Sequence, residues 1–196
     1  MIGLLIQDNA YEQDIRELLM SFYPGETYAH EVKDGLDFYV ETRLGDSAVS
    51  VLIWENGAAP EGWKLSDSRT RPSDLSDHSA TKNVIKKMFY LMLAARTGKE
   101  MPWGSLTGIR PTKIALTRLE EGWKEEDIRS FMKETYLASD EKIDLSIEIA
   151  AREKKLLEPL DYERGYSLYV GIPFCPTTCL YCSFTSYPIE KWRGRT

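Results

Sequence analysis

Three cysteines lie close together near the end of the 196-residue chain: Cys175, Cys179 and Cys182, at the spacing C-x3-C-x2-C. The sequence holds no other cysteine. Thiolates are the natural ligands of iron–sulfur clusters, most of which are held by four of them. A cubane held by three would leave one iron open to a small molecule, as an open zinc position is in catalysis. The spacing therefore favours a cluster site with an open iron.

Spacing alone leaves other uses of these cysteines open. Structural zinc generally takes four nitrogen or sulfur ligands, and the two histidines, His30 and His78, are far from the loop in sequence. A thioredoxin-like pair of Cys179 and Cys182 would leave Cys175 without a role. Chance clustering of three structural cysteines is the simplest alternative. A secreted disulfide scaffold would have more cysteines, spread along the chain, so we expect a reducing cytosol.

The residues around the cysteines resemble a known signature. Residues 169–184 read Tyr-Val-Gly-Ile-Pro-Phe-Cys-Pro-Thr-Thr-Cys-Leu-Tyr-Cys-Ser-Phe. This string is similar to the radical S-adenosylmethionine (SAM) signature of the oxygen-independent coproporphyrinogen III oxidase family, typically Tyr-x-His-Ile-Pro-Phe-Cys-x3-Cys-x-(aromatic)-Cys. Residues 105–113, Ser-Leu-Thr-Gly-Ile-Arg-Pro-Thr-Lys, resemble the N-terminal extension of a coproporphyrinogen dehydrogenase-like branch.

The resemblance implies the cofactors of the site and the residues that bind them. Cys175, Cys179 and Cys182 would each bind one iron of a [4Fe–4S] cluster, while SAM chelates the fourth iron. Tyr169 matches the family tyrosine that lies against SAM, and Tyr181 matches the aromatic residue beside the adenine. Ordinary strand or loop packing is the alternative role of both tyrosines. No catalytic residue is assigned.

The resemblance also implies a reaction and partners. Such enzymes convert coproporphyrinogen III to protoporphyrinogen IX in haem biosynthesis by oxidative decarboxylation of propionate side chains. The implied partners are this tetrapyrrole and a low-potential electron donor such as flavodoxin or ferredoxin. The cofactors carry the chemistry, and the protein orients them and excludes water and oxygen.

Two departures from the family pattern limit this interpretation. Gly171 stands where the main branch of the family has histidine, which weakens the assignment of the reaction but not that of the cluster. The chain also stops at Thr196, before the glycine-rich SAM motif of the family. We therefore expect an N-terminal fragment that is not active by itself. A haem-binding or haem-transfer protein of the same family and a non-catalytic iron–sulfur sensing domain stay as alternatives.

Hydrophobic spacing predicts an α+β fold that begins with a β-α-β-β unit. Residues 2–7 indicate a strand and residues 15–22 an amphipathic helix. Two strands follow near 36–44 and 48–54, joined by a turn at Gly45-Asp46. Residues 55–77 are rich in Gly, Pro, Ser and Asp, so they are predicted to be loop or weak structure.

Helices dominate the next hundred residues. An apolar stripe predicts a helix over 79–97 that packs in the core, and Gly98 suits its C-terminal end. The residues of this stripe are Val84, Ile85, Met88, Leu91, Met92 and Ala95. Further helices are expected over 111–121, 125–136 and 140–157, and a strand over 166–172 that leads into the cysteine loop. This gives three domains: an N-terminal α+β domain (1–100), a helical extension (101–160) and the first strand and cluster loop of a truncated radical SAM β/α barrel (166–196).

A second candidate site lies in residues 103–113, a glycine-flanked loop that enters a predicted helix. Backbone N–H groups at a helix start, with Arg110 and Lys113 beside them, are suited to bind an anion. In a porphyrinogen enzyme the anions would be propionates. A plain turn with Pro111 at the first helical position is the alternative.

Charge and hydropathy exclude some functions. The net charge of −6 argues against a general nucleic-acid binder. No apolar run approaches the roughly 18 residues of a membrane span. The first residues have no basic region and no small-residue cleavage site, so they indicate a strand and not a signal peptide. We expect a cytoplasmic protein.

Overall fold

The computed structural model describes residues 1–32, 34–56, 62–108, 110–161, 164–166, 168–177, 179–184 and 186–194. The chain separates into two compact units, residues 1–156 and residues 157–196, each of which is described by itself. The strands of the first unit are β1 (Ile2–Ile6), β2 (Tyr28–Ala29), β3 (Phe38–Leu44), β4 (Ala48–Asn56) and β5 (Trp63–Pro72). The α-helices are α1 (Glu12–Phe22), α2 (His78–Thr97), α3 (Thr112–Glu120), α4 (Glu125–Tyr136) and α5 (Asp140–Leu157).

The five strands form one sheet in the order β2-β1-β3-β4-β5. β1 runs parallel to both of its neighbours, whereas β3, β4 and β5 form an antiparallel meander. The hairpin between β3 and β4 closes where Gly45 N–H donates to the carbonyl of Ala48 at 2.9 Å. The predicted mixed α+β class is therefore confirmed. The four elements predicted for its opening are observed as β1, α1, β3 and β4, whereas the short strand β2 between α1 and β3 was not predicted.

The prediction of loop or weak structure over residues 55–77 was wrong, because these residues include the ten-residue strand β5. β5 is an edge strand whose side chains are mostly exposed, and it pairs with β4 along its whole length. Its polar composition concealed it, since the strand is held by its backbone ladder with β4 and not by burial of an apolar face.

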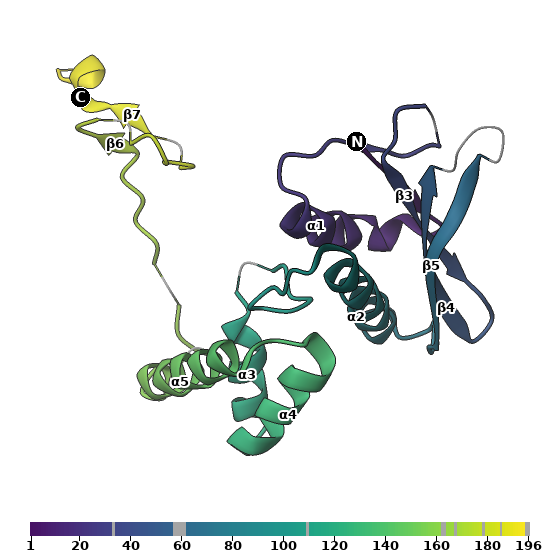
Figure 1. The fold of residues 1–196 in the computed structure, drawn as a ribbon. Helices are drawn as coiled ribbons and strands as arrows, with labels where there is room; N and C mark the ends of the chain where they lie inside the picture. The colour runs from purple at the N-terminus through teal and green to yellow at the C-terminus, as the bar shows by residue number, and fades with distance from the viewer. Residues whose placement is uncertain are drawn as a thin grey trace. The chain divides into compact units, whose positions relative to one another are not determined.

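Helices α1 and α2 lie against one face of the sheet (Figure 1). The core between them and the sheet includes Phe22 and Phe89, both with 0% of their surface exposed. The predicted face of α2 was partly wrong, because Leu91 is 36% exposed while Phe89 and Leu93 are buried. The opposite face of the sheet carries a smaller cluster in which the ring of Tyr39 stacks on that of Trp54.

The three later helices enclose a second core, made chiefly by Ala115, Leu116, Ile128, Met132, Ile143 and Ile147. The predicted bounds of α4 and α5 match those observed, and Gly98 ends α2 in the left-handed conformation with φ 67°. The segment 101–108 joins the two cores. In it, Gly104 has φ 57° and its backbone runs so close to the carbonyls of Tyr136 and Leu137 that a Cβ atom would clash with them.

In the second unit the predicted strand over 166–172 is not observed in the described residues of that range. The strands there are β6 (Phe174–Cys175) and β7 (Tyr187–Pro188), which form a two-residue parallel ladder followed by a 3-10 turn, η2 (Ile189–Trp192). A strand needs neighbours for its backbone groups, and none of the described residues pairs with 168–172. In the part of the chain that the structure describes, no helix has the length and apolar character needed to cross a membrane.

Candidate metal centre and polar cavities

The three cysteines lie on a short loop of the second unit. Cys175 ends β6, and the backbone N–H of Cys182 donates to the carbonyl of Cys179 at 3.0 Å, which closes a turn between them. All three are free thiols, with Cys179 exposed and the other two half-buried. The Cys182 thiol faces the carbonyl of Phe184 at 3.7 Å. Three unpaired thiols within eight residues suit a cluster in the chemistry of their donor atoms.

The thiols are not gathered around a common point. Among the described residues, no group of three or more His, Cys, Asp or Glu side chains lies closely enough together to hold a metal ion. Thiolate sites commonly take their final shape only when the metal binds, because ligand binding and folding are coupled. The three thiols are therefore ligands of the type that a cluster takes. That they come together around one cluster stays a prediction.

An aromatic group supports this loop. The rings of Phe174, Tyr187 and Trp192 lie within 5.9–6.3 Å of one another, measured between ring centroids. The backbone N–H of Tyr187 also donates to the carbonyl of Pro173 at 2.7 Å. These contacts hold the residue next to Cys175 against the segment that follows the last cysteine. The spacing of the three aromatic residues did not predict this group, although their number in so short a segment was a usable signal.

The two tyrosines predicted to bind SAM are exposed in the second unit. Tyr169 is 88% exposed and Tyr181 is 90% exposed. Gly171 lies beside the Tyr169 ring, and a Cβ atom at Gly171 would come within 3.2 Å of that ring. Gly171, at the position where the signature that this string resembles has histidine, therefore leaves space for the Tyr169 ring beside the backbone. The predicted cofactor contacts of the two tyrosines remain predictions.

The two cations of the predicted anion site differ in their partners. The Arg110 guanidinium forms an ion pair with Glu153 on α5. Lys113 is exposed on α3, and its backbone N–H donates to the carbonyl of Arg110 at 3.1 Å. Residue 109 lies outside the described residues. Propionate binding by Arg110 would therefore first require its ion pair with Glu153 to break.

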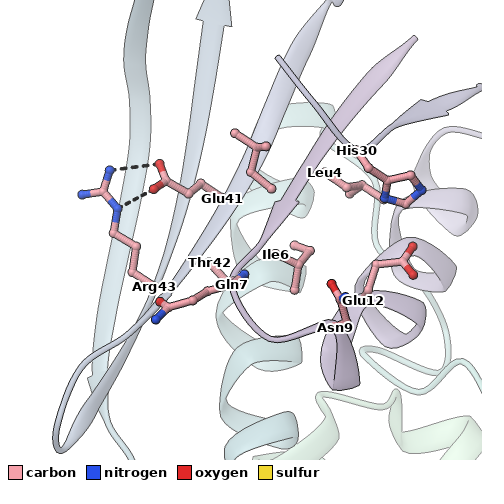
Figure 2. A pocket seen from close by; sticks show the side chains of 10 residues that line it. Leu4, Ile6, Gln7, Asn9, Glu12, His30, Glu41, Thr42 and Arg43 are labelled. Carbon is pink, nitrogen blue, oxygen red and sulfur yellow. Dashed lines mark hydrogen bonds and ion pairs between the residues drawn. The ribbon is translucent and has the colours of Figure 1, made fainter.

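A pocket of about 440 Å³ lies beside β1 and β3 (Figure 2). Its polar side chains on the strands bind one another. The Arg43 guanidinium donates to both oxygens of Glu41, at 2.6 and 3.0 Å, and Gln7 Oε1 accepts from the Leu44 backbone at 2.6 Å. Figure 2 shows Glu12 and His30 near each other on the other side of the pocket. The Gln7 contact adds to the parallel ladder between β1 and β3, and the Arg43–Glu41 pair lies within β3. Neither contact assigns chemistry to the pocket.

A second polar cavity surrounds Lys86, which is 8% exposed. The Lys86 ammonium donates to Asp14 at 3.3 Å and to the Thr107 hydroxyl at 2.8 Å, and that hydroxyl donates to Glu17 at 2.9 Å. This network joins α1, α2 and the segment resembling the family extension. Desolvation by burial lowers the pKa of Lys86, against the opposing effect of Asp14. A hydrogen bond from Gln13 is the main cause that lowers the pKa of Glu17.

In a comparison with curated proteins, the chain is similar to an oxygen-independent coproporphyrinogen-III oxidase-like protein. That relative is HemZ of Bacillus subtilis (strain 168). It is 32% identical over 196 residues, in an alignment that covers 97% of this chain and 38% of HemZ. The resemblance inferred from the cysteine motif is confirmed by this relative, of whose length the chain spans well under half. No protein-family model and no solved structure matches the chain.

Proposed function

We propose that the chain is part of a radical SAM oxidoreductase that acts on coproporphyrinogen III. The cysteine loop carries this proposal, because it offers three free thiols at C-x3-C-x2-C within a string that resembles the family signature. The similarity to HemZ, whose name describes an oxygen-independent coproporphyrinogen-III oxidase-like protein, supports the substrate class. The proposed partners are the tetrapyrrole and a low-potential electron donor such as flavodoxin or ferredoxin.

In this proposal Cys175, Cys179 and Cys182 would hold a [4Fe–4S] cluster to which SAM would bind. When bound, these cofactors would supply one-electron chemistry at a propionate side chain of the substrate. The residues of the chain would position the cluster and SAM and shield them from water. Tyr169 and Tyr181 present exposed rings that SAM would cover, and the aromatic group beside Cys175 braces the loop. The barrel that would complete the site also belongs to the proposal.

A haem-binding role in the same family is the second candidate, and Gly171 is the observation that favours it. This residue provides no imidazole where the main branch of the family has one. Loss of that group removes a candidate for proton transfer or SAM placement without removing a cluster ligand. Haem binding without SAM cleavage would therefore replace the oxidase proposal.

Anaerobic reconstitution tests the cluster first. The whole protein, and not the 196-residue chain alone, is incubated with iron and sulfide, then reduced and examined by EPR with and without SAM. We expect a [4Fe–4S] signal that changes when SAM is added, because SAM would bind the open iron. Cys179→Ser should abolish the signal, whereas the double variant His30→Ala/His78→Ala should leave it intact.

Other results would redirect the proposal in defined ways. A signal indifferent to SAM would favour a sensing domain, and stoichiometric zinc with loss of binding in the histidine variant would favour a mixed zinc site. Turnover of coproporphyrinogen III is then assayed with the whole protein. Failure of that protein to convert the substrate while it binds haem would remove the oxidase activity and leave the cluster assignment unchanged.

A further inference from the structure

The cavity around Lys86 has a volume of about 240 Å³ and lies where α1 and α2 meet segment 105–108 and the end of α4. Its walls differ in charge. α1 contributes the carboxylates of Asp14 and Glu17, and α2 contributes the ammonium groups of Lys82 and Lys86. Residues three, four and seven apart share one face of a helix, which places Ser79, Asn83 and both lysines on the same wall. An acidic wall thus stands against a basic wall that also bears hydroxyl and amide groups.

Hydrogen bonds hold part of this cavity in place. Lys86 donates to Asp14 and to Thr107, so its charge is compensated within the protein. Glu17 accepts from Gln13 at 3.0 Å and from Thr107 at 2.9 Å, which uses two of about four acceptor positions on a carboxylate. Among the described residues, none forms an ion pair or hydrogen bond with the Lys82 ammonium. One ammonium on α2 and part of one carboxylate on α1 therefore remain available to a ligand.

The opposed charges restrict the kind of ligand that fits. A simple anion attracted by Lys82 would face repulsion from Asp14 and Glu17, and a simple cation would face repulsion from the lysines. A molecule with both charges satisfies both walls. The volume is below the roughly 300–1,000 Å³ of pockets for drug-sized ligands, which limits the ligand to a small molecule.

We propose that this cavity binds a free α-amino acid, with its ammonium group toward Glu17 and its carboxylate toward Lys82. Ser79 and Asn83 offer further hydrogen bonds to the carboxylate from the same face of α2. The segment that resembles the family extension would then contribute through Thr107 and Gly108, which line this cavity, and not through Arg110 and Lys113. This inference does not depend on the cluster, because the residues of the site all lie in residues 1–156.

The test uses the twenty proteinogenic amino acids one at a time, at millimolar concentration, with the purified chain. Binding is measured by the shift in melting temperature and by ligand-observed NMR, and then by calorimetry for any amino acid that binds. Each binding amino acid is compared with the carboxylic acid that lacks its amino group and with the amine that lacks its carboxylate. We expect at least one amino acid to bind, and both analogues to bind at least tenfold more weakly.

Matched variants locate the site. Lys82→Ala should weaken binding at least tenfold, whereas Lys155→Ala on α5 makes the same charge change outside the cavity and should leave the affinity unchanged. Glu17→Gln should weaken binding of the amino acid but not binding of the analogue that lacks its amino group. If Lys82→Ala fails to fold, Lys82→Gln, which keeps most of the side-chain stem, replaces it.

Three results would overturn the proposal. Absence of binding by every amino acid would remove the ligand class. An affinity that is equal in wild type and in the Lys82 variant would place the ligand elsewhere. Equal affinity for an amino acid and its deaminated analogue would make this a simple anion site. None of these results bears on cluster binding, so failure here is distinguishable from failure of the proposed function.

Discussion

The two units of the chain differ in how far their aromatic side chains are buried. In residues 1–156, Phe22 and Phe89 are fully buried between a sheet and two helices. In residues 157–196, Tyr169, Tyr181 and Phe184 are 80–90% exposed. Among the described residues, a sheet and helices surround the apolar side chains of the first unit, whereas the second unit has a two-residue ladder and the aromatic group beside Cys175. Burial thus depends on what the neighbouring backbone can enclose and not on aromatic content alone.

Limited proteolysis should show the largest difference between the units. We expect chymotrypsin to cleave first after exposed aromatic residues such as Tyr166 and Tyr169, and to leave a resistant product that contains residues 1–156. Local opening of an exposed segment requires a free energy near zero, whereas the core opens only at a cost close to that of global unfolding. Mass spectrometry of the early products checks this. Early cleavage at Phe22 or Phe89 would contradict the assignment of the first unit as the stable one.

A matched pair of phenylalanine substitutions measures the same difference in stability. Phe89→Ala should lower the free energy of unfolding by about 3–5 kcal/mol, because it removes a buried ring and leaves a cavity. Phe184→Ala, at a side chain that is 80% exposed, should change the free energy of unfolding by less than about 0.5 kcal/mol. Urea unfolding followed by circular dichroism measures both. Similar losses in the two variants would mean that Phe184 is covered in solution.

Much of the first unit could be predicted from sequence, because local signals decided its helices. The acidic residues 125–127 complement the positive end of α4, and helical spacing over residues 15–22 predicted α1, which buries Ile15, Leu18, Leu19 and Phe22. β5 was missed, since its stability comes from pairing with β4 and its side chains carry little apolar signal. The opposite error concerns the strand predicted over 166–172, whose residues are typical of a strand but have no strand partner among the described residues.

The candidate sites also differ in how far they can be predicted from the sequence. The cysteine loop is continuous in sequence, so its residue types and spacing are visible in the amino-acid sequence alone. The Lys86 network joins α1, α2 and Thr107, and its hydrogen-bonded pairs are separated by up to 90 residues in sequence. No local pattern reports such a contact. The sequence also predicted Arg110 as an anion ligand, but its pairing with Glu153 on α5 depends on helix packing.

Charged pairs extend the comparison between the units. Lys86→Met should lower the free energy of unfolding by about 2 kcal/mol at neutral pH, because charge-assisted hydrogen bonds to Asp14 and Thr107 are lost. Arg164→Met removes an ion pair with Asp161 in which both side chains are mostly exposed, at 89% and 64%. That loss should be close to zero. Equal effects of the two substitutions would mean that Lys86 is not held as described.

The pH dependence of the Lys86 effect follows from its pKa. Burial lowers the pKa of Lys86 in the folded protein below the ordinary value of 10.5. The unfolded chain therefore binds this proton more tightly, and stability rises with pH between the folded and the unfolded pKa. Lys86→Met lacks this rise. The deficit of the variant relative to wild type should grow as the pH approaches 10.5, and a deficit that shrinks over this range would contradict the direction of the shift.

The smallest effect tests side-chain hydrogen bonds to the backbone in each unit. The Asp77 carboxylate accepts from the backbone N–H of Ala80 at 2.9 Å and caps the N-terminus of α2, and Asp161 accepts from Arg164 N–H at 3.2 Å in the second unit. Asp77→Ala should lower the free energy of unfolding by about 1 kcal/mol, since loss of an N-cap leaves a helix donor unpaired. Asp161→Ala should leave the main unfolding transition unchanged, because Asp161 and Arg164 are both exposed and cap no helix of the core. A measurable shift of the unfolding transition in the Asp161 variant would show that residues near 161 unfold together with the first unit. The two units would then unfold as one cooperative unit.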